Sequence, residues 1–418
     1  MIGSNMATAY WARRGWHDGW VYSLNPSLQN YAWGRTDSIP ELLGSEPSDT
    51  PVAEAWWGAH PASPATVDCD DQALGLDVLI DRDPNHALGV DVAQEFDGRL
   101  PFLLKVLAID APLSIQVHPS MEQAAEGFDI EEAAGIPPTS PARTFRDRSH
   151  KPEMIVALTP MTVLAGFRDL PGLRGDLHLL GKDGAALLEL VENAESPASA
   201  VTAYIRSVLA LPRGAHVVTT LASLNSSADP SAQVRAACSA LASHPGDPGA
   251  LVALAMNVLY LRPGSACFVG DGTVHSYQSG VGVEIMANSD NVVRAGLTPK
   301  PINVPLLLDL MNAVPATAER PERVTEGAVT IYSAPVAEFE LASVSGGDWT
   351  APAGPRIVLS LAGSTTVTSA DEERELACGE AVFVPFGDGE ITVRTPGHAV
   401  IASVPLSAAR GTGAPTGD

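Results

Sequence analysis

The stretch that decides the fold is LPFLLKVLAIDAPLSIQVHPS, residues 100–120. It contains two short apolar segments separated by a turn, and such segments are typical of β-strands. Similar runs, PVAEAWW from residue 51 and EMIVALTPMTVLAGF from residue 153, lie on either side of it in the chain. We therefore predict a β domain here, interrupted by one helix in the acidic segment MEQAAEGFDIEEAAG, residues 121–135.

Two other kinds of sequence follow this β region. In segments such as ASAVTAYIRSVLAL, Ala and Leu recur every three or four residues, which predicts an inserted domain of short helices. Nearer the C-terminus, evenly spaced strand patterns such as RIVLSLAG and EAVFVPFG predict a sandwich or small barrel. The predicted division is an N-terminal extension at 1–20, a catalytic β domain at 21–170 and 257–320, a helical insert at 171–256, a C-terminal β domain at 321–406 and a flexible tail at 407–418.

The composition limits what the protein can bind. The 418 residues carry a formal net charge of -24, which argues against a nucleic-acid or anionic-membrane partner but still allows one small phosphate held by local cations. No apolar run in the sequence approaches the roughly 20 residues that span a bilayer. The four cysteines are scattered without a CxxC pair, which favours a reducing cytoplasm over a disulfide framework. The sequence does not decide between a monomer and a homo-oligomer.

Four residues of the β region form a candidate metal site: Gln116, His118, Glu153 and His275. Residues two apart in a strand point to the same face, so Gln116 and His118 can enter one interior, as can Lys151 and Glu153. Two imidazoles, a carboxylate and an amide oxygen suit Zn²⁺ or another borderline divalent ion. Spacing alone does not separate this interpretation from a hydrogen-bonded structural pair. We interpret the histidines without such a context as structural: His17, His60, His86, His178, His216, His244 and His398.

A second group of charged residues lies in GVEIMANSDNVVRAGLTPK, residues 282–300. It comprises Glu284, Asp290, Arg294 and Lys300. Asn-Ser-Asp-Asn is turn chemistry, so we predict that Arg294 and Lys300 lie on a loop near the mouth of the barrel. An Arg and a Lys in that position can bind a phosphate group. The alternative is a solvated loop with surface ion pairs.

Taken together, these segments resemble type I mannose-6-phosphate isomerases of the cupin superfamily. The resemblance is carried, in the family's order, by NPSLQNYAWG, EAWWGAHPASPA, QVHPS, HKPEM, MTVLAGFR and DGTVHSYQSGVGVEIMANSDNVVRAGLTPK. It covers about residues 22–310 at the level of motifs. Trp57 and the PKPINV segment depart from the family pattern beside the key positions, which leaves the fine substrate preference open.

The resemblance implies a mainly β fold with a cupin-type catalytic barrel, a helical insert and a C-terminal cupin-like β domain. It implies interconversion of D-mannose 6-phosphate and D-fructose 6-phosphate, in mannose and GDP-mannose metabolism, with one Zn²⁺ per chain. The implied ligands are Gln116, His118, Glu153 and His275. The family's active-site arginine falls on Arg294. Other implied contacts are His150, Lys151, Glu284 and Asp290 at the reacting end of the sugar, and Lys105, Ser114 and Lys300 at the substrate or its phosphate.

Such an isomerisation moves a proton between C2 and C1 through a cis-enediol, whose oxyanions need a metal ion or a fixed cation for stabilisation. His150, Lys151 and Asp290 are the candidates for the proton-transfer base, and the sequence does not rank them. Two rival functions use the same barrel. One is an Fe²⁺ oxygenase with two histidines and one carboxylate, against which the NSDNVVRAGLTPK segment argues. The other is a sugar-phosphate sensor without catalysis, against which the intact ligand and arginine positions argue.

Overall fold

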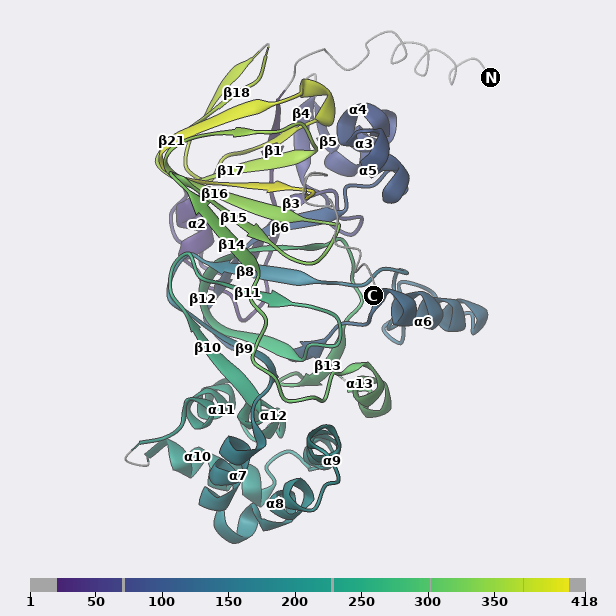
Figure 1. Cartoon of the computed structure of the whole chain (residues 1–418), viewed down its shortest axis with the longest axis vertical. Coiled ribbons are helices and arrows are strands. Elements are labelled where there is room, and N and C mark those ends of the chain that lie inside the picture. The colour runs from purple at the N-terminus through teal and green to yellow at the C-terminus, as the bar shows by residue number, and fades with distance from the viewer. Residues whose placement is uncertain (1–20, 70–71, 227–228, 301, 371, 406–418) are drawn as a thin grey trace, which may run out of the picture.

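The computed structural model describes residues 21–69, 72–226, 229–300, 302–370 and 372–405 (Figure 1). The predicted N-terminal extension and flexible tail lie outside these residues. Within them, the strands form two sheets, one of ten strands and one of eleven. The sheets lie next to each other along the long axis of the molecule, and a block of helices extends beyond the ten-stranded sheet (Figure 1).

The ten-stranded sheet is built around β6 (Phe102–Ile109), in which all eight residues are buried. A strand covered on both faces is expected to be apolar throughout, and Lys105 is the one charged residue of FLLKVLAI. β6 pairs with β12 (His275–Ala287), which also pairs with β7, β8 and β9. The other strands are β2 (Ser27–Gln29), β3 (Glu54–Gly58), β7 (Ile115–Val117), β8 (Glu153–Ala157), β9 (Met161–Phe167), β10 (Met256–Leu261), β11 (Ala266–Val269) and β13 (Val293–Gly296).

The long strand β12 changes partners at Gly280. Before this glycine the strand pairs with β7 and β9, and from it onward the strand pairs with β6 and β8. Gly280 has a φ of +106°, and a Cβ there would lie 2.6 Å from the Pro160 carbonyl oxygen. Only glycine fits this bend without strain, and the bend lets one strand join both halves of the sheet.

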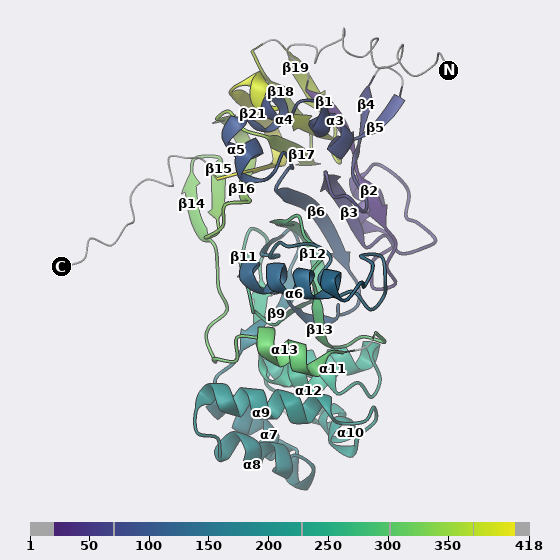
Figure 2. The same cartoon turned by 90° about the vertical axis from the view of Figure 1, so that its right-hand side faces the viewer.

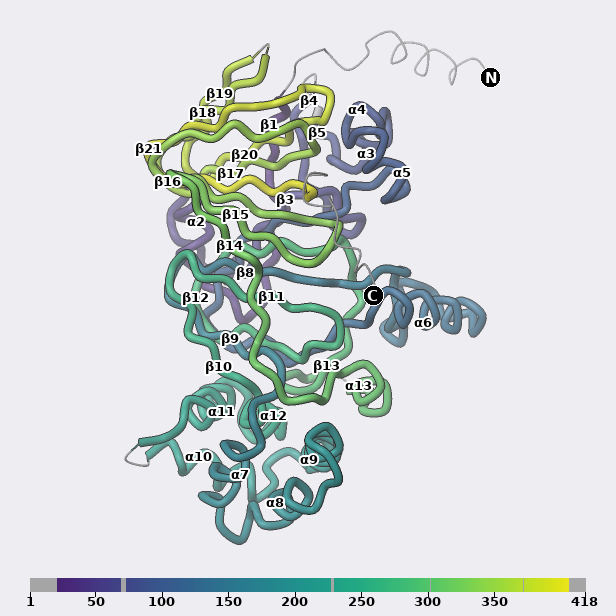
Figure 3. Tube along the Cα trace, viewed as in Figure 1, coloured from purple at the N-terminus to yellow at the C-terminus, as the bar shows by residue number. Residues whose placement is uncertain are grey.

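The eleven-stranded sheet combines C-terminal strands with three strands from the start of the described chain. β1 (Tyr22–Asn25) pairs with β20 (Ala381–Val384) on one side and with β4 (Thr66–Cys69) on the other. Figure 3 shows β1 among the C-terminal strands. The remaining strands are β5 (Gln72–Gly75), β14 (Glu322–Glu326), β15 (Val329–Ser333), β16 (Glu340–Ala351), β17 (Arg356–Ala362), β18 (Thr365–Thr368), β19 (Glu373–Leu376) and β21 (Ile391–Ser403). The short 3₁₀-helix η3 (Phe386–Asp388) lies between β20 and β21.

The helical block lies where the alanine and leucine periodicity predicted helices. It comprises α7 (Leu170–Leu179), η1 (Gly181–Asp183), α8 (Ala185–Glu192), α9 (Pro197–Leu209), α10 (His216–Ser223), η2 (Leu224–Ser226), α11 (Ala232–Ser243) and α12 (Gly249–Leu254). α9 begins with a capping box, in which the side chains of Ser196 and Ser199 accept hydrogen bonds from each other's backbone N–H. Its buried Tyr204 donates a hydrogen bond of 2.9 Å to the Leu251 carbonyl oxygen, which ties α9 to α12.

The remaining helices lie at the sides of the sheets. They are α2 (Ser38–Leu42), α3 (Leu76–Arg82), α4 (Pro84–Leu88), α5 (Val90–Glu95), α6 (Met121–Ala133) and α13 (Val304–Leu310). The helix predicted in residues 121–135 is confirmed as α6, which projects from the ten-stranded sheet toward the viewer of Figure 2. Helices α3 to α5 were not predicted, because at five to seven residues each is too short to show a helical period.

The predicted mainly β fold with inserted helices is confirmed. One sheet runs from β10 to β2 and the other from β14 to β5, and within the described residues no ladder joins these ends. The cupin-type barrel is therefore open. The domain boundaries stay a prediction. β1 belongs to the predicted catalytic domain and β20 to the predicted C-terminal domain, so their pairing connects the two.

A close backbone contact joins the helical block to the ten-stranded sheet. Gly249, the first residue of α12, faces Gly296, the last residue of β13. A Cβ on Gly249 would lie 2.8 Å from the Gly296 Cα and 2.7 Å from the Leu297 backbone nitrogen. Backbone atoms cannot yield as a flexible side chain can, so the two glycines set the distance between α12 and β13. Because β13 carries Arg294, the contact also bears on a predicted active-site residue.

Gly249→Ala should lower the free energy of unfolding by about 1 to 3 kcal/mol, the usual cost of an extra methyl group in a packed contact. Urea unfolding followed by circular dichroism measures this change. Gly175→Ala is the matched control, since a Cβ on Gly175 of α7 would meet no atom within 4 Å. This control should be neutral or stabilising by up to about 1 kcal/mol. Equal stability of Gly249→Ala and the wild type would show that α12 and β13 separate at no cost.

Candidate metal centre and active site

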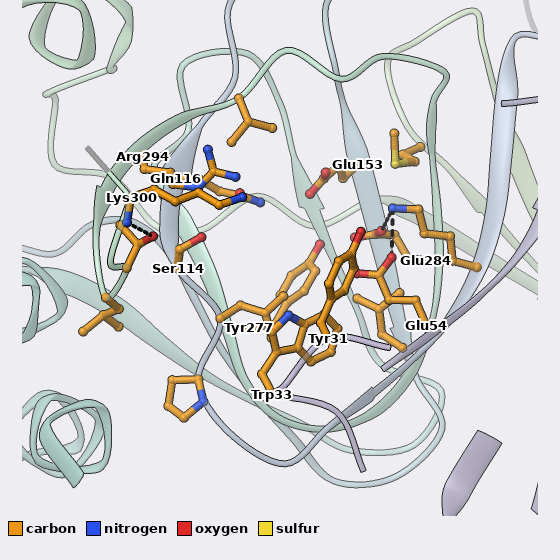
Figure 4. Close-up of a pocket in the computed structure, with 18 of the residues that line it drawn as sticks. Tyr31, Trp33, Glu54, Ser114, Gln116, Glu153, Tyr277, Glu284, Arg294 and Lys300 are labelled. Carbon is orange, nitrogen blue, oxygen red and sulfur yellow. Dashed lines mark hydrogen bonds and ion pairs between the residues drawn. The ribbon is translucent and has the colours of Figure 1, made fainter. Parts of the chain in front are cut away.

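A cavity of about 670 Å³ lies against the ten-stranded sheet, within the size range of small-molecule sites. Its wall is formed by residues of β3, β6, β7, β8, β12 and β13, by the loop at residues 31–33 and by the end of α11. Figure 4 shows two groups of polar side chains in it, Ser114, Gln116, Arg294 and Lys300 on one side, and Glu54, Glu153 and Glu284 on the other.

The four predicted metal ligands lie together. His118 follows β7, Glu153 begins β8 and His275 begins β12, and these side chains are 1%, 2% and 1% exposed. Their candidate ligand atoms all lie within 4.8 Å of one another. Gln116 is paired with His275 across β7 and β12, and its side-chain nitrogen lies 3.2 Å from His275 Nε2. A half-turn of the amide presents its oxygen to the same point.

Hydrogen bonds on the far side of each imidazole leave the nitrogen that faces the cluster without a proton. His118 Nδ1 donates to the Lys151 carbonyl oxygen at 2.7 Å. His275 Nδ1 donates to the Thr273 carbonyl oxygen at 2.9 Å. Among the described residues, His118 Nε2 and Glu153 Oε2 are buried without a hydrogen-bond partner. Glu153 Oε2 and His275 Nε2, both acceptors, lie 3.2 Å apart, so a divalent cation fits this cluster.

The buried surroundings favour the protonation states that bind a metal ion. Burial holds the pKa of His118 well below its usual value, which keeps the imidazole neutral. Burial alone would raise the pKa of Glu153, but the attraction of the neighbouring Lys151 ammonium leads the opposing effects, and the pKa lies well below its usual value. A neutral imidazole and an ionised carboxylate are the forms that coordinate Zn²⁺.

Lys105 lies in the cavity between two carboxylates because strand pairing places it opposite Trp56 on β3 and Glu284 on β12. Its Nζ lies 3.2 Å from Glu284 Oε2 and 3.6 Å from Glu54 Oε2. Burial lowers the pKa of Lys105, but the two carboxylates raise it by more, so the ammonium is kept. Burial, followed by the charge of Glu153, raises the pKa of Glu284.

The opposite side of the cavity is positive. Neither the Arg294 nor the Lys300 side chain has an ion-pair or hydrogen-bond partner in the part of the chain that the structure describes. Burial lowers the pKa of Arg294, and the charge of Arg294 lowers the pKa of Lys300. Lys300 lies in a bend after β13, but the prediction of a loop for Arg294 was wrong, because Arg294 belongs to β13. Arg294 pairs with Gln116 across β13 and β7. Because Val293 packs into the core, alternation along β13 turns the Arg294 side chain to the cavity.

His150 lies outside this cavity. Its neighbour Lys151 lines the cavity and contacts Glu153 through Nζ, as the predicted alternation requires. The His150 side chain points away from the cavity, and its Nε2 lies 2.7 Å from Glu338 Oε1 and its Nδ1 3.3 Å from Asp271 Oδ1. The structure therefore does not bring His150 to the reacting end of a sugar in the cavity.

Two histidines that we interpreted as structural line the cavity, so they are candidate site residues as well. His60 Nε2 lies 3.4 Å from Asp290 Oδ1, and this contact lowers the pKa of Asp290. His244, at the end of α11, reaches the wall from the helical block. The signal for His60 was its place in the EAWWGAHP motif. No local pattern marked His244, because only the packing of α11 brings it to the sheet.

Aromatic residues complete the wall, and they were not predicted as site residues. They are Tyr31, Trp33, Trp56 and Tyr277. Trp57, which departs from the family pattern, is completely buried in the core and does not line the cavity. Alternation along β3 turns Trp56 to the cavity, where its ring lies 4.7 Å from Lys105 Nζ. The Trp57 departure therefore lies behind the cavity wall and contributes no atom to it.

A mainly β fold with a buried cluster of two histidines and one carboxylate, beside a cavity with a cationic wall, defines a metal-dependent enzyme of the cupin type for an anionic substrate. The chain belongs to the type I phosphomannose isomerase family. The family model "Phosphomannose isomerase type I, catalytic domain" matches residues 21–170. The predicted family is confirmed.

The similarity extends over most of the chain. Mannose-6-phosphate isomerase of Escherichia coli K12 is 36% identical over 393 residues, 92% of this chain and 99% of that protein. The human mannose-6-phosphate isomerase is 33% identical over 356 residues, 77% of this chain and 81% of that protein. A crystal structure of mannose 6-phosphate isomerase from Salmonella typhimurium, bound to its substrate and to zinc, matches with a TM-score of 0.84 at 32% identity. This match covers 92% of the present chain and 100% of the Salmonella chain.

The surroundings of His150 predict a pH dependence of stability. Burial lowers the pKa of His150, but Asp271 and Glu338 raise it by more, to about 9. Because this pKa exceeds the unfolded value of 6.5, the stabilisation is complete below about pH 6.5 and is lost as the pH rises through about 9. Urea unfolding of the zinc-free protein across this range should show the loss, and His150→Gln should reduce it. His178→Gln, at an exposed position of α7, is the control, and an undiminished loss in His150→Gln would contradict the assignment.

Proposed function

We propose that this chain is a zinc-dependent aldose-ketose isomerase that interconverts D-mannose 6-phosphate and D-fructose 6-phosphate. The observation that carries the proposal is the buried cluster of His118, Glu153 and His275 beside a cavity whose opposite wall is cationic. A sugar phosphate offers hydroxyl and carbonyl oxygens to a metal ion and a dianionic end to Arg and Lys. The names of the relatives, and the zinc and substrate in the Salmonella structure, support the same activity.

We assign the phosphate end of the substrate to Lys300 and Ser114, with Arg294 between this end and the metal centre. Arg294 lies opposite Gln116 in the ladder of β13 and β7, next to the candidate ligands. Two like charges without a counter-ion in the described chain raise each other's free energy, as the lowered pKa of Lys300 reflects. A bound phosphate would relieve this repulsion, so the wall is suited to an anion before the substrate arrives.

We assign the reacting end of the sugar to the metal centre, where zinc would be held by the buried cluster and by Gln116, which reaches the cluster from the side of Arg294. Zinc supplies Lewis-acid polarisation of the substrate oxygens when it is bound. Lys151 contacts Glu153, and Lys105 lies between Glu54 and Glu284. Both lysines are buried cations whose position is fixed by carboxylates, and they are placed to stabilise the oxyanions of the cis-enediol.

We assign the proton transfer between C2 and C1 to Asp290. Of the three candidates, His150 lies outside the cavity and Lys151 is paired with Glu153. Asp290 lines the cavity, and its ionised carboxylate can accept a proton there. Its contact with His60 fixes the position of the carboxylate, although the same contact lowers its pKa and so makes it a weaker base than a free Asp.

We also propose a cytoplasmic location and a role in mannose and GDP-mannose metabolism. Among the cysteines whose side chains are described, Cys238, Cys267 and Cys378 are free thiols, which suits a reducing compartment. Within the described residues, no helix has the length and apolar character needed to cross a membrane. The net charge of -24 continues to argue against a nucleic-acid partner.

Removal of zinc should abolish the isomerase activity reversibly. A coupled assay follows fructose 6-phosphate formed from mannose 6-phosphate, first with protein stripped by a chelator and then after addition of Zn²⁺ or Fe²⁺. We expect the activity to return with Zn²⁺. Binding of mannose 6-phosphate without turnover in the zinc-loaded protein would favour the sensor, and oxygen consumption with Fe²⁺ would favour the oxygenase. The first result would remove the isomerase assignment, and the second would remove it only together with an absence of turnover in the zinc-loaded protein.

Arg294→Ala should lower kcat/KM by about 10²-fold to 10³-fold, the usual effect of removing one preorganised group that stabilises a transition state. Its zinc content should match the wild type, because Arg294 is not among the candidate ligands. Steady-state kinetics and metal analysis measure the two effects separately. Lys182→Ala removes an exposed cation from η1 and serves as the control. Full turnover in Arg294→Ala would end its assigned role.

A further inference from the structure

Residues 149–152 form no helix or strand, yet this segment and the residue after it supply two parts of the metal centre. The Lys151 carbonyl oxygen accepts the hydrogen bond that sets the tautomer of His118. Glu153 follows directly and is itself a candidate ligand. A shift of about 1 Å in this segment would therefore misplace the His118 ring and the Glu153 carboxylate together. Hydrogen bonds hold the two ends of the segment, from the Asn291 side-chain amide to the Ser149 carbonyl oxygen at 2.9 Å and from the Ala287 backbone nitrogen to the Pro152 carbonyl oxygen at 3.0 Å. The middle of the segment needs a further contact on the side away from the cavity.

His150 provides that contact. Its imidazole points away from the cavity toward carboxylates from two other parts of the chain. His150 Nε2 lies 2.7 Å from Glu338 Oε1, and His150 Nδ1 lies 3.3 Å from Asp271 Oδ1. Asp271 belongs to the turn that leads into β12, and the next residue of this turn, Gly272, donates a backbone hydrogen bond of 3.0 Å to the His118 carbonyl oxygen. One imidazole thus connects the segments that position all three clustered ligands.

Glu338 comes from the other sheet. It lies between β15 and β16, two strands of the eleven-stranded sheet, and it is 8% exposed. Its Oε2 accepts a hydrogen bond of 3.1 Å from the Ala337 backbone nitrogen, which leaves Oε1 for His150. A buried carboxylate is costly unless it is paired. The pair of Glu338 and His150 is therefore a specific contact between the C-terminal strands and the metal-site segment.

We infer that Glu338 is a positioning residue of the metal centre, which acts through His150 to hold residues 150–153 in the geometry that binds the metal ion. The inference rests on the zinc site proposed above. It gives the C-terminal sheet a part in the chemistry and accounts for His150 without a contact to substrate. Both ring nitrogens face acceptors, which fits an imidazolium. The pKa of His150 agrees, because the two carboxylates raise it to about 9 against the effect of burial.

Glu338→Gln tests the inference because it keeps the shape of the side chain and removes its charge. Zinc affinity is measured by competition with a chromophoric chelator, and ligand geometry by the visible spectrum of the Co²⁺-substituted protein. We expect the zinc dissociation constant to rise by about tenfold or more, the usual effect of losing a residue that orients a ligand. The Co²⁺ spectrum should change with it.

Glu340→Gln is the matched control. Glu340 lies two positions further along the chain, is 9% exposed, and accepts its hydrogen bond from Ser333 Oγ at 2.7 Å. The substitution removes an equally buried carboxylate from the same region, so it reproduces any general loss of stability. It should leave the zinc affinity and the Co²⁺ spectrum as in the wild type.

Wild-type zinc affinity and an unchanged Co²⁺ spectrum in Glu338→Gln would overturn the inference, whatever the isomerase activity. If this variant does not fold, Glu338→Asp, which keeps the charge but withdraws it by one methylene, is measured in the same way. Weakened zinc binding in Glu338→Asp supports the inference, and wild-type binding overturns it. A wild-type protein that binds no zinc would instead remove the metal site and the proposed function with it, so the two failures are distinguishable.

Discussion

The metal centre depends on one constraint. Two imidazole nitrogens and a carboxylate face the same buried point, and none of the atoms that face it carries a proton. His118, Glu153 and His275 belong to three different strand ends, and each is at most 2% exposed. Unpaired polar atoms in such surroundings cost free energy that a bound cation removes. The carbonyl groups of Lys151 and Thr273 direct both imidazoles, so backbone segments outside the cluster decide whether a metal ion fits.

The ladder of β12 brings the two halves of this site together. Its bend at Gly280 lets the strand begin at a candidate ligand, His275, and then carry Glu284 to the lysine of β6. Residues on paired strands keep fixed separations, which loops do not ensure. One wall of the cavity has the opposite charge to the molecule as a whole. The chain has a net charge of -24, but this wall carries the cations Arg294 and Lys300. An anionic ligand therefore meets local attraction there.

Much of the site could be predicted from periodicity. Alternation placed Gln116 and His118 on one face and Lys151 and Glu153 on another, and the contacts agree, since Gln116 and His118 both contact His275 and Lys151 contacts Glu153. The His150 side chain points away from the cavity, and alternation could not say what lies on that side. The partners of His150 come from positions far along the chain, and nothing in the HKPE segment indicates them.

The sequence by itself determined the local elements, the chemical types of the ligands and the family, because these follow from short-range periodicity and from motifs. Only the tertiary structure decided that the barrel is open, that Arg294 lies on a strand, and that His60 and His244 reach the cavity. It also decided that Glu338 of the far sheet meets the metal-site segment. The physical reason is that pairing register and packing across long separations depend on the free energy of the whole chain, which no single segment records.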